Sequence, residues 1–159
     1  MALEIERKFL VTGEGWRNAP AERLSQGYLC HEPSRTVRVR IAGEQAFLTI
    51  KGITQGATRQ EFEYPIPVAD AQSLLALCGA GVIDKYRHRY VHAGKTWEVD
   101  AFLGDNQGLV VAEIELANED EVFDKPDWLG EEVTHDARYY NANLSTQPFV
   151  HWNKAALAE

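Results

Sequence analysis

The chain has few of the residues that would assign it to several common classes. Among its 159 residues only two are cysteine. Cys30 and Cys78 have neither the spacing of a metal site nor the density of a disulfide framework, so we expect both to be reduced, buried thiols. No apolar run approaches the roughly 18 residues of a membrane span. The first residues also lack the basic-then-apolar pattern of a signal peptide. These absences predict a cytoplasmic protein without a membrane partner.

Positive charge is also scarce. The chain has 16 Lys and Arg residues against 24 Asp and Glu, giving a net charge of -8. Binding to a nucleic-acid backbone requires a net basic surface, so the composition argues against a nucleic-acid partner. A small polyanion is not excluded, because it responds to the local field of its pocket. The five histidines show no ligand spacing, so no histidine metal site is predicted.

Periodicity and composition predict one strand-rich domain spanning residues 1–159. The chain is 45% hydrophobic and 25% charged, which suits a folded protein. No linker, internal repeat or low-complexity segment divides it. Residues 16–24 read as a short, weakly amphipathic piece. We expect helices at 68–78 and about 137–144, and strands at 3–11, 26–30, 36–41, 45–51, 59–65, 83–91, 95–102 and 109–116.

The first strand carries the pattern on which the interpretation depends. A strand alternates faces at every residue, so Glu4, Glu6 and Lys8 project together while Ile5 and Phe9 project to the other side. Taken alone, this is most simply a solvated sheet face, since antiparallel sheets commonly expose one side to water.

The same spacing of two recurs along the chain, and each later strand carries charges of one sign. A solvated face usually mixes residue types, because like charges placed opposite each other cost about 0.2–1 kcal/mol per pair. The last strand is apolar on both faces just before its acids, which indicates burial on both sides. The rows are Arg38 and Arg40; Lys51; Glu61 and Glu63; Lys85, Arg87 and Arg89; Glu98 and Asp100; and Glu113 and Glu115.

An arrangement that satisfies these rows is a closed or nearly closed barrel with a charged, wet interior and an apolar exterior covered partly by the two helices. Paired carboxylates suit a hard divalent cation, and arginine and lysine rows suit phosphate oxygens. The alternative is an interior of salt bridges without a ligand. Because buried ion pairs are poor for stability, that interior favours a functional role.

With these charged rows, the sequence resembles the CYTH-domain proteins, which are triphosphate tunnel metalloenzymes. It is most similar to their small bacterial single-domain type. The opening Glu4-Ile5-Glu6-Arg7-Lys8 matches the Glu-x-Glu-x-Lys signature of that family. The resemblance covers essentially the whole chain. Further matching segments are 26–29, 37–40, 49–52, 61–63, 85–87, 97–100, 112–115, 130–134 and 138–141.

The resemblance implies a mainly β (α+β) fold, an eight-stranded antiparallel closed barrel that binds a linear triphosphate with Mg²⁺ or Mn²⁺. It implies triphosphate contacts from Lys8, Arg38, Arg40, Lys51, Lys85 and Arg87. Metal ligands are expected at Glu4, Glu6, Glu113 and Glu115, with Glu61, Glu63, Glu98 and Asp100 acting on the metal through water. The catalytic candidates are Glu4, Glu6, Lys8 and Lys85. A homodimer is an expectation by analogy.

The first expected activity is hydrolysis of inorganic tripolyphosphate to pyrophosphate and phosphate. The alternatives are a thiamine triphosphatase, a nucleoside triphosphatase, an adenylate cyclase that forms cyclic AMP, and a non-catalytic polyphosphate-binding module. The sequence leaves open the role of Tyr28, that of Arg89, and whether the C-terminal helix closes one end of the tunnel.

Overall fold

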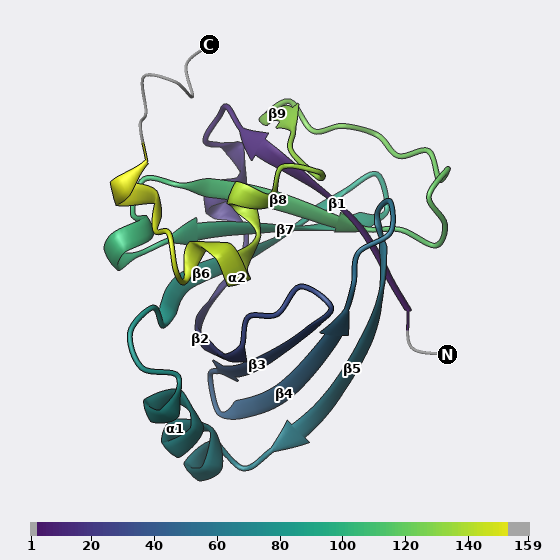
Figure 1. The fold of residues 1–159 in the computed structure, drawn as a ribbon. Helices are drawn as coiled ribbons and strands as arrows, with labels where there is room; N and C mark the ends of the chain where they lie inside the picture. The colour runs from purple at the N-terminus through teal and green to yellow at the C-terminus, as the bar shows by residue number, and fades with distance from the viewer. Residues whose placement is uncertain (1–2, 153–159) are drawn as a thin grey trace.

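Eight antiparallel strands close into a barrel in the computed structural model, which describes residues 3–152 (Figure 1). The strand order is β5-β4-β3-β2-β6-β7-β8-β1, and β1 pairs with β5 to close the ring. The predicted fold class is confirmed. The strands are β1 (Leu3–Val11), β2 (Ala21–Cys30), β3 (Arg35–Ala42), β4 (Gln45–Gly52), β5 (Thr58–Ile66), β6 (Ile83–His92), β7 (Lys95–Phe102) and β8 (Val110–Glu115).

Two elements differ from the sequence-based expectation. Strand β2 begins at Ala21, five residues earlier than predicted, because its first half pairs with β6 from Ala21↔His88 to Gln26↔Ile83. A short ninth strand, β9 (Leu129–Glu132), pairs with the far end of β1 outside the ring. Neither segment has an alternating apolar pattern, so pairing with a neighbouring strand decides its conformation.

Many apolar side chains of the strands pack outside the barrel, although Phe62, Tyr64 and Tyr86 stay exposed. One cluster joins Phe9, Trp97 and Ile114 with Trp16 and Trp128, which come from two segments outside the eight strands. Helix α1 (Val68–Leu77) covers another part, where Ala71 packs in a cluster with residues of β3 and β4. In Figure 1 this helix lies outside the barrel at the lower left. The charged face of each strand is therefore left to the interior.

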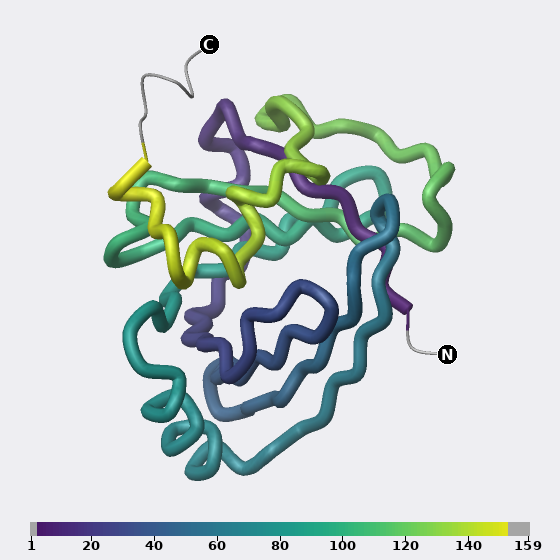
Figure 2. The backbone as a smooth tube through the Cα atoms, in the orientation of Figure 1, coloured from purple at the N-terminus to yellow at the C-terminus, as the bar shows by residue number. Residues whose placement is uncertain are grey.

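The predicted C-terminal helix is not continuous. Residues Ala137–Tyr139 form the 3₁₀ turn η3, and α2 is a single turn at Asn141–Leu144. Tyr140 separates them in an extended conformation. The Asp136 side chain caps the 3₁₀ turn, while Thr134 Oγ1 accepts from the backbone N–H of Lys8. Figure 2 shows this yellow segment beside the ends of β6 and β8.

The remaining elements are short 3₁₀ turns: η1 (Gly15–Asn18), η2 (Gly104–Asn106) and η4 (Phe149–His151). The two cysteines are free, as expected, but both are only partly buried. Within residues 3–152 no helix is long and apolar enough to cross a membrane.

Candidate active site in the barrel interior

The interior of the barrel holds a cavity of about 420 Å³ whose wall is mostly charged. Strand alternation brings residues from all eight strands to this one wall. Of the residues expected at the site, the wall includes Glu4, Glu6, Lys8, Arg38, Arg40, Lys51, Glu61, Glu63, Arg87, Glu98, Glu113 and Glu115.

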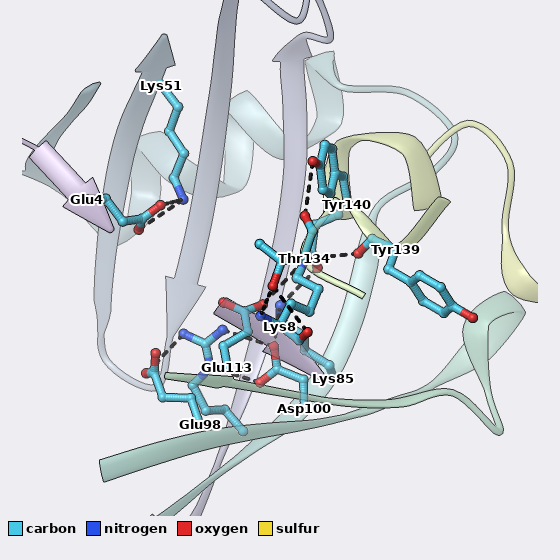
Figure 3. A network of polar contacts seen from close by, with 12 residues as sticks. Glu4, Lys8, Lys51, Lys85, Glu98, Asp100, Glu113, Thr134, Tyr139 and Tyr140 are labelled. Atoms are coloured by element: carbon cyan, nitrogen blue, oxygen red, sulfur yellow. Dashed lines mark hydrogen bonds and ion pairs between the residues drawn. The ribbon is translucent and has the colours of Figure 1, made fainter. Parts of the chain in front are cut away.

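Two expected site residues, Lys85 and Asp100, lie behind this wall. Their side chains are 0% and 1% exposed, and Lys85 Nζ lies 2.8 Å from Asp100 Oδ2. The guanidinium of Arg87 donates to both oxygens of Asp100, at 2.8 and 2.9 Å. The single carboxylate of Asp100 therefore contacts two buried cationic side chains, and Arg87 Nη1 also lies 3.2 Å from Glu98; Figure 3 shows Asp100 beside Lys85.

This network shifts the pKa of each member. Burial alone raises the pKa of Asp100, but the Arg87 and Lys85 cations outweigh it and hold that pKa far below the ordinary value. Burial lowers the pKa of Lys85 to about 7; Asp100 opposes the shift, and the Arg87 and Arg40 cations add to it. The lysine is therefore only partly protonated near neutral pH.

The C-terminal segment covers this end of the cavity. Lys8 Nζ donates to the backbone carbonyl of Tyr139 at 3.0 Å, and Lys85 Nζ donates to Asn141 Oδ1 at 2.9 Å. Gln26 Nε2 donates to the same Asn141 oxygen at 3.3 Å. In Figure 3 Tyr139 and Tyr140 stand beside Lys8 at this end. The segment's polar groups thus hold two of the site's lysines in place.

Three arginines form the most strongly basic part of the wall. Burial and the nearby Arg38 and Arg87 lower the pKa of Arg40 to about 9. Arg40 Nε donates to Gln26 Oε1 at 3.0 Å, and Arg38 Nη2 donates to Thr49 Oγ1 at 3.2 Å. Arg38 Nε is buried without a hydrogen-bond partner among the described residues. Crowded guanidinium groups with a free donor are a site for an anion.

The acids of β1 and β8 form two different environments. Glu4 accepts from Lys51 Nζ at 2.9 and 3.2 Å, and Lys51 also lies 3.4 Å from Glu61 (Figure 3 labels the first pair). Glu6 instead shares a hydrogen bond with Glu113, and burial together with that neighbour raises the pKa of Glu6 well above its ordinary value. Burial raises the pKa of Glu113, but Lys8 and other cations bring it down to about 2.

The Glu6–Glu113 pair fits a divalent cation better than any other feature of the wall. Its donors are all oxygen, and a cation between the two carboxyl groups would relieve the burial and the repulsion by Glu113 that raise the pKa of Glu6. Among residues 3–152 no three acids or histidines are arranged as a ready-made metal cage. Mg²⁺ commonly uses only one or two carboxylates and completes its shell with water and phosphate oxygens, so two carboxylates suffice.

Sequence reasoning missed several residues of the site. Gln26, Asn141 and Tyr140 are neutral and belong to no charged row, yet Asn141 and Tyr140 line the cavity and Gln26 forms hydrogen bonds with Asn141 and Arg40. Tyr28, whose position was left open, is buried in the wall, and Arg59 also lines it. Of these residues only Arg59 has a signal in the sequence, because it alternates with Glu61 along one strand.

The fold and site define a class of protein: a closed antiparallel barrel whose interior presents basic and acidic rows to a small polyanion. The chain belongs to the CYTH domain family, whose model matches residues 2–145. A curated relative in Acetivibrio thermocellus, an inorganic triphosphatase, is 46% identical over 97% of this chain and 100% of that protein. A second inorganic triphosphatase, from Nitrosomonas europaea, is 37% identical over 89% of this chain and 96% of that protein.

Solved structures agree with this assignment. A crystal structure of an inorganic triphosphatase is 36% identical, with a TM-score of 0.67, and covers 91% of this chain and 95% of that chain. A protein from Pyrococcus horikoshii shares the fold with a TM-score of 0.56 at 23% identity, over 72% of this chain and 80% of that chain.

The first prediction concerns Asp100. Asp100→Asn leaves Lys85 buried without its counter-charge and leaves Arg87 with Glu98 alone, so the free energy of unfolding should fall by about 3–5 kcal/mol. Urea unfolding followed by circular dichroism measures the loss. Glu63→Gln is the control, because its side chain is 41% exposed and should change stability by less than about 1 kcal/mol. Equal losses in the two variants would contradict the assignment.

The second prediction concerns the proton on Glu6. Below its raised pKa the metal-free protein holds a proton that a bound cation must displace. Mg²⁺ or Mn²⁺ binding should therefore release protons, and metal affinity should rise with pH until Glu6 is ionised. Calorimetry in two buffers of different ionisation enthalpy measures the release. Glu6→Gln should abolish it, whereas Glu14→Gln on the surface should keep it; binding without proton release in the wild type would refute the idea.

Proposed function

We propose that this protein is a divalent-metal-dependent hydrolase of linear triphosphates, acting on inorganic tripolyphosphate to give pyrophosphate and phosphate. The observation that carries the proposal is the crowding of Arg38, Arg40 and Arg87, with one buried guanidinium donor unused. Such a cluster is unfavourable when empty and becomes favourable when an anion of high charge density enters. The names of the two curated relatives support the same substrate.

The arginines and lysines hold the substrate along its length. Arg38, Arg40 and Arg87 line the cavity and can donate to phosphoryl oxygens in pairs, and Lys8 and Lys51 add point charges. Lys85 lies behind the wall, so its proposed contact requires its ammonium group to exchange Asn141 for a phosphoryl oxygen. With three anionic groups so neutralised, attack by water on the terminal phosphorus becomes easier.

The proposed metal would be held by Glu6 and Glu113, with Glu4 and Glu115 beside them. Glu61, Glu63 and Glu98 line the cavity and would act on the metal through water, whereas Asp100, expected to do the same, lies behind the wall and is held by Arg87 and Lys85. When bound, Mg²⁺ or Mn²⁺ supplies charge neutralisation on the phosphoryl oxygens and orients water. Lys51 must release Glu4 for that carboxylate to take part, since the two are joined at 2.9 Å. Glu115 is exposed, so it is the most accessible of the four.

The proton of the attacking water needs an acceptor, which we assign to Lys85. Burial lowers its pKa to about 7, so a fraction of the amine is neutral near pH 7 and can take the proton as the new P–O bond forms and the bridging P–O bond breaks. Both its hydrogen bond to Asn141 and its ion pair with Asp100 have to open for Lys85 to reach the cavity in this step, and such rearrangement between apo and substrate-bound forms is common.

The decisive experiment is a phosphate-release panel. Tripolyphosphate, ATP and thiamine triphosphate are each tested with Mg²⁺, with Mn²⁺ and with a chelator. We expect tripolyphosphate to be hydrolysed fastest, only with metal, and Glu6→Gln to reduce turnover by at least about 100-fold while the fold is kept. Cyclic AMP from ATP would indicate a cyclase instead. No turnover of any compound, with tight tripolyphosphate binding retained, would indicate a binding module.

A pH profile tests the role of Lys85. At saturating metal and substrate, kcat should rise with pH through about 7, because the neutral amine is the active form. Lys85→Arg keeps the charge but cannot release its proton, so kcat should fall by about 100-fold or more and lose this dependence. An unchanged pH profile in Lys85→Arg would remove the assignment.

A further inference from the structure

The basic row of β6 shows which end of the cavity is open. Along this strand the side chain of Lys85 is 0% exposed, that of Arg87 is 8% exposed and that of Arg89 is 46% exposed. The acids of the next strand follow the same gradient, from 1% at Asp100 to 35% at Glu98. The cavity is therefore enclosed at Lys85, where the C-terminal segment lies, and open to solvent at Arg89.

Arg89 differs from the two deeper cations in its partner. Arg89 Nη1 lies 3.1 Å from Glu22 Oε2, on the neighbouring strand β2. Glu98, which stands opposite Arg89 in the β6–β7 register, is directed instead to Arg87 Nη1 at 3.2 Å. Among residues 3–152, Glu22 is thus the acid that forms an ion pair with Arg89, and both side chains line the same cavity.

The position of this pair has a consequence for substrate length. The deeper guanidinium groups of Arg38 and Arg40 line the cavity and can meet a chain of three phosphoryl groups, and Arg87 lines it beside them, held by Asp100 and Glu98. A longer linear polyphosphate whose terminal group is seated at the enclosed end must extend outward past Arg89. There its fourth phosphoryl group meets a guanidinium that is already neutralised and the carboxylate that neutralises it, which repels an anion.

We propose that the Glu22–Arg89 pair is a charge-based length filter at the open end of the cavity, which favours three phosphoryl groups over four. Glu22 occupies the guanidinium that a fourth phosphoryl group would otherwise bind. The inference rests on the proposed function and adds to it a limit on the length of the substrate. It also gives a role to Arg89, which continues the row of Lys85 and Arg87 but has no place in the three-phosphoryl cradle.

The test compares two linear substrates, tripolyphosphate and tetrapolyphosphate, in kcat/KM for phosphate release. Glu22→Gln frees Arg89, so the tetrapolyphosphate-to-tripolyphosphate ratio should rise by about three- to tenfold, on the scale of one partly exposed charge contact. Arg89→Gln alone should not raise the ratio. The double variant should return close to the wild-type ratio, because the gain depends on the freed guanidinium.

The control is Glu14→Gln, which breaks an exposed ion pair with Arg17 outside the cavity and should leave both rates as they are. Circular dichroism and urea unfolding confirm that each variant is folded. An unchanged ratio in Glu22→Gln, an equal gain on both substrates, or a gain that persists in the double variant would each overturn the filter.

Failure of the proposed function would look different, since the wild type would then release no phosphate from either substrate. In that case the filter can still be tested by calorimetry, without divalent cation. The binding of the two polyphosphates is measured for the wild type, Glu22→Gln, Arg89→Gln and the double variant. A rise of the affinity ratio in Glu22→Gln alone supports it, and equal ratios in all four overturn it.

Discussion

The ion network around Asp100 is the interaction on which the barrel interior depends. Lys85 and Arg87 come from one strand, two residues apart, so they cannot separate, and both are almost fully buried. Their desolvation is tolerable because Asp100 on the paired strand contacts both, and Glu98 on the same strand also contacts Arg87. These acids compensate the cations at the enclosed end of the cavity. Arg38 and Arg40 line the cavity itself, where an anion can reach them.

That charge distribution is possible because the barrel is covered from outside. In an ordinary barrel the core lies within, but here the aromatic clusters lie on the outer faces, with Phe9 and Trp97 in edge contact and Trp128 against Trp97. These clusters supply the apolar burial that stabilises the fold. The interior is then free to carry charged side chains whose geometry is set by the hydrogen-bonded ladders rather than by packing.

Much of this could be predicted because strand alternation is a strict rule. Charges two apart must share a face, so the rows of β1, β3, β6 and β8 predicted a charged interior and the apolar residues between them an outer core. Cross-strand partners were not predictable in the same way. Lys51 contacts Glu4 because β1 closes onto β5, and that closure depends on barrel stagger, which no local pattern encodes. Neutral contacts such as Asn141 to Lys85 leave no charge signal at all.

A cavity that bound only an anion would need only bases, yet both acids and bases line this interior. A purely basic cavity would repel itself when empty, and burial together with repulsion from Arg38 and Arg87 lowers the pKa of Arg40 even with acids nearby. The acids that pair with lysines, such as Glu4 with Lys51, limit it. Glu6 and Glu113 are different, because burial and the neighbouring Glu113 raise the pKa of Glu6. A cation between the two carboxyl groups would relieve their repulsion, and a metal-bound triphosphate would supply both charges at once.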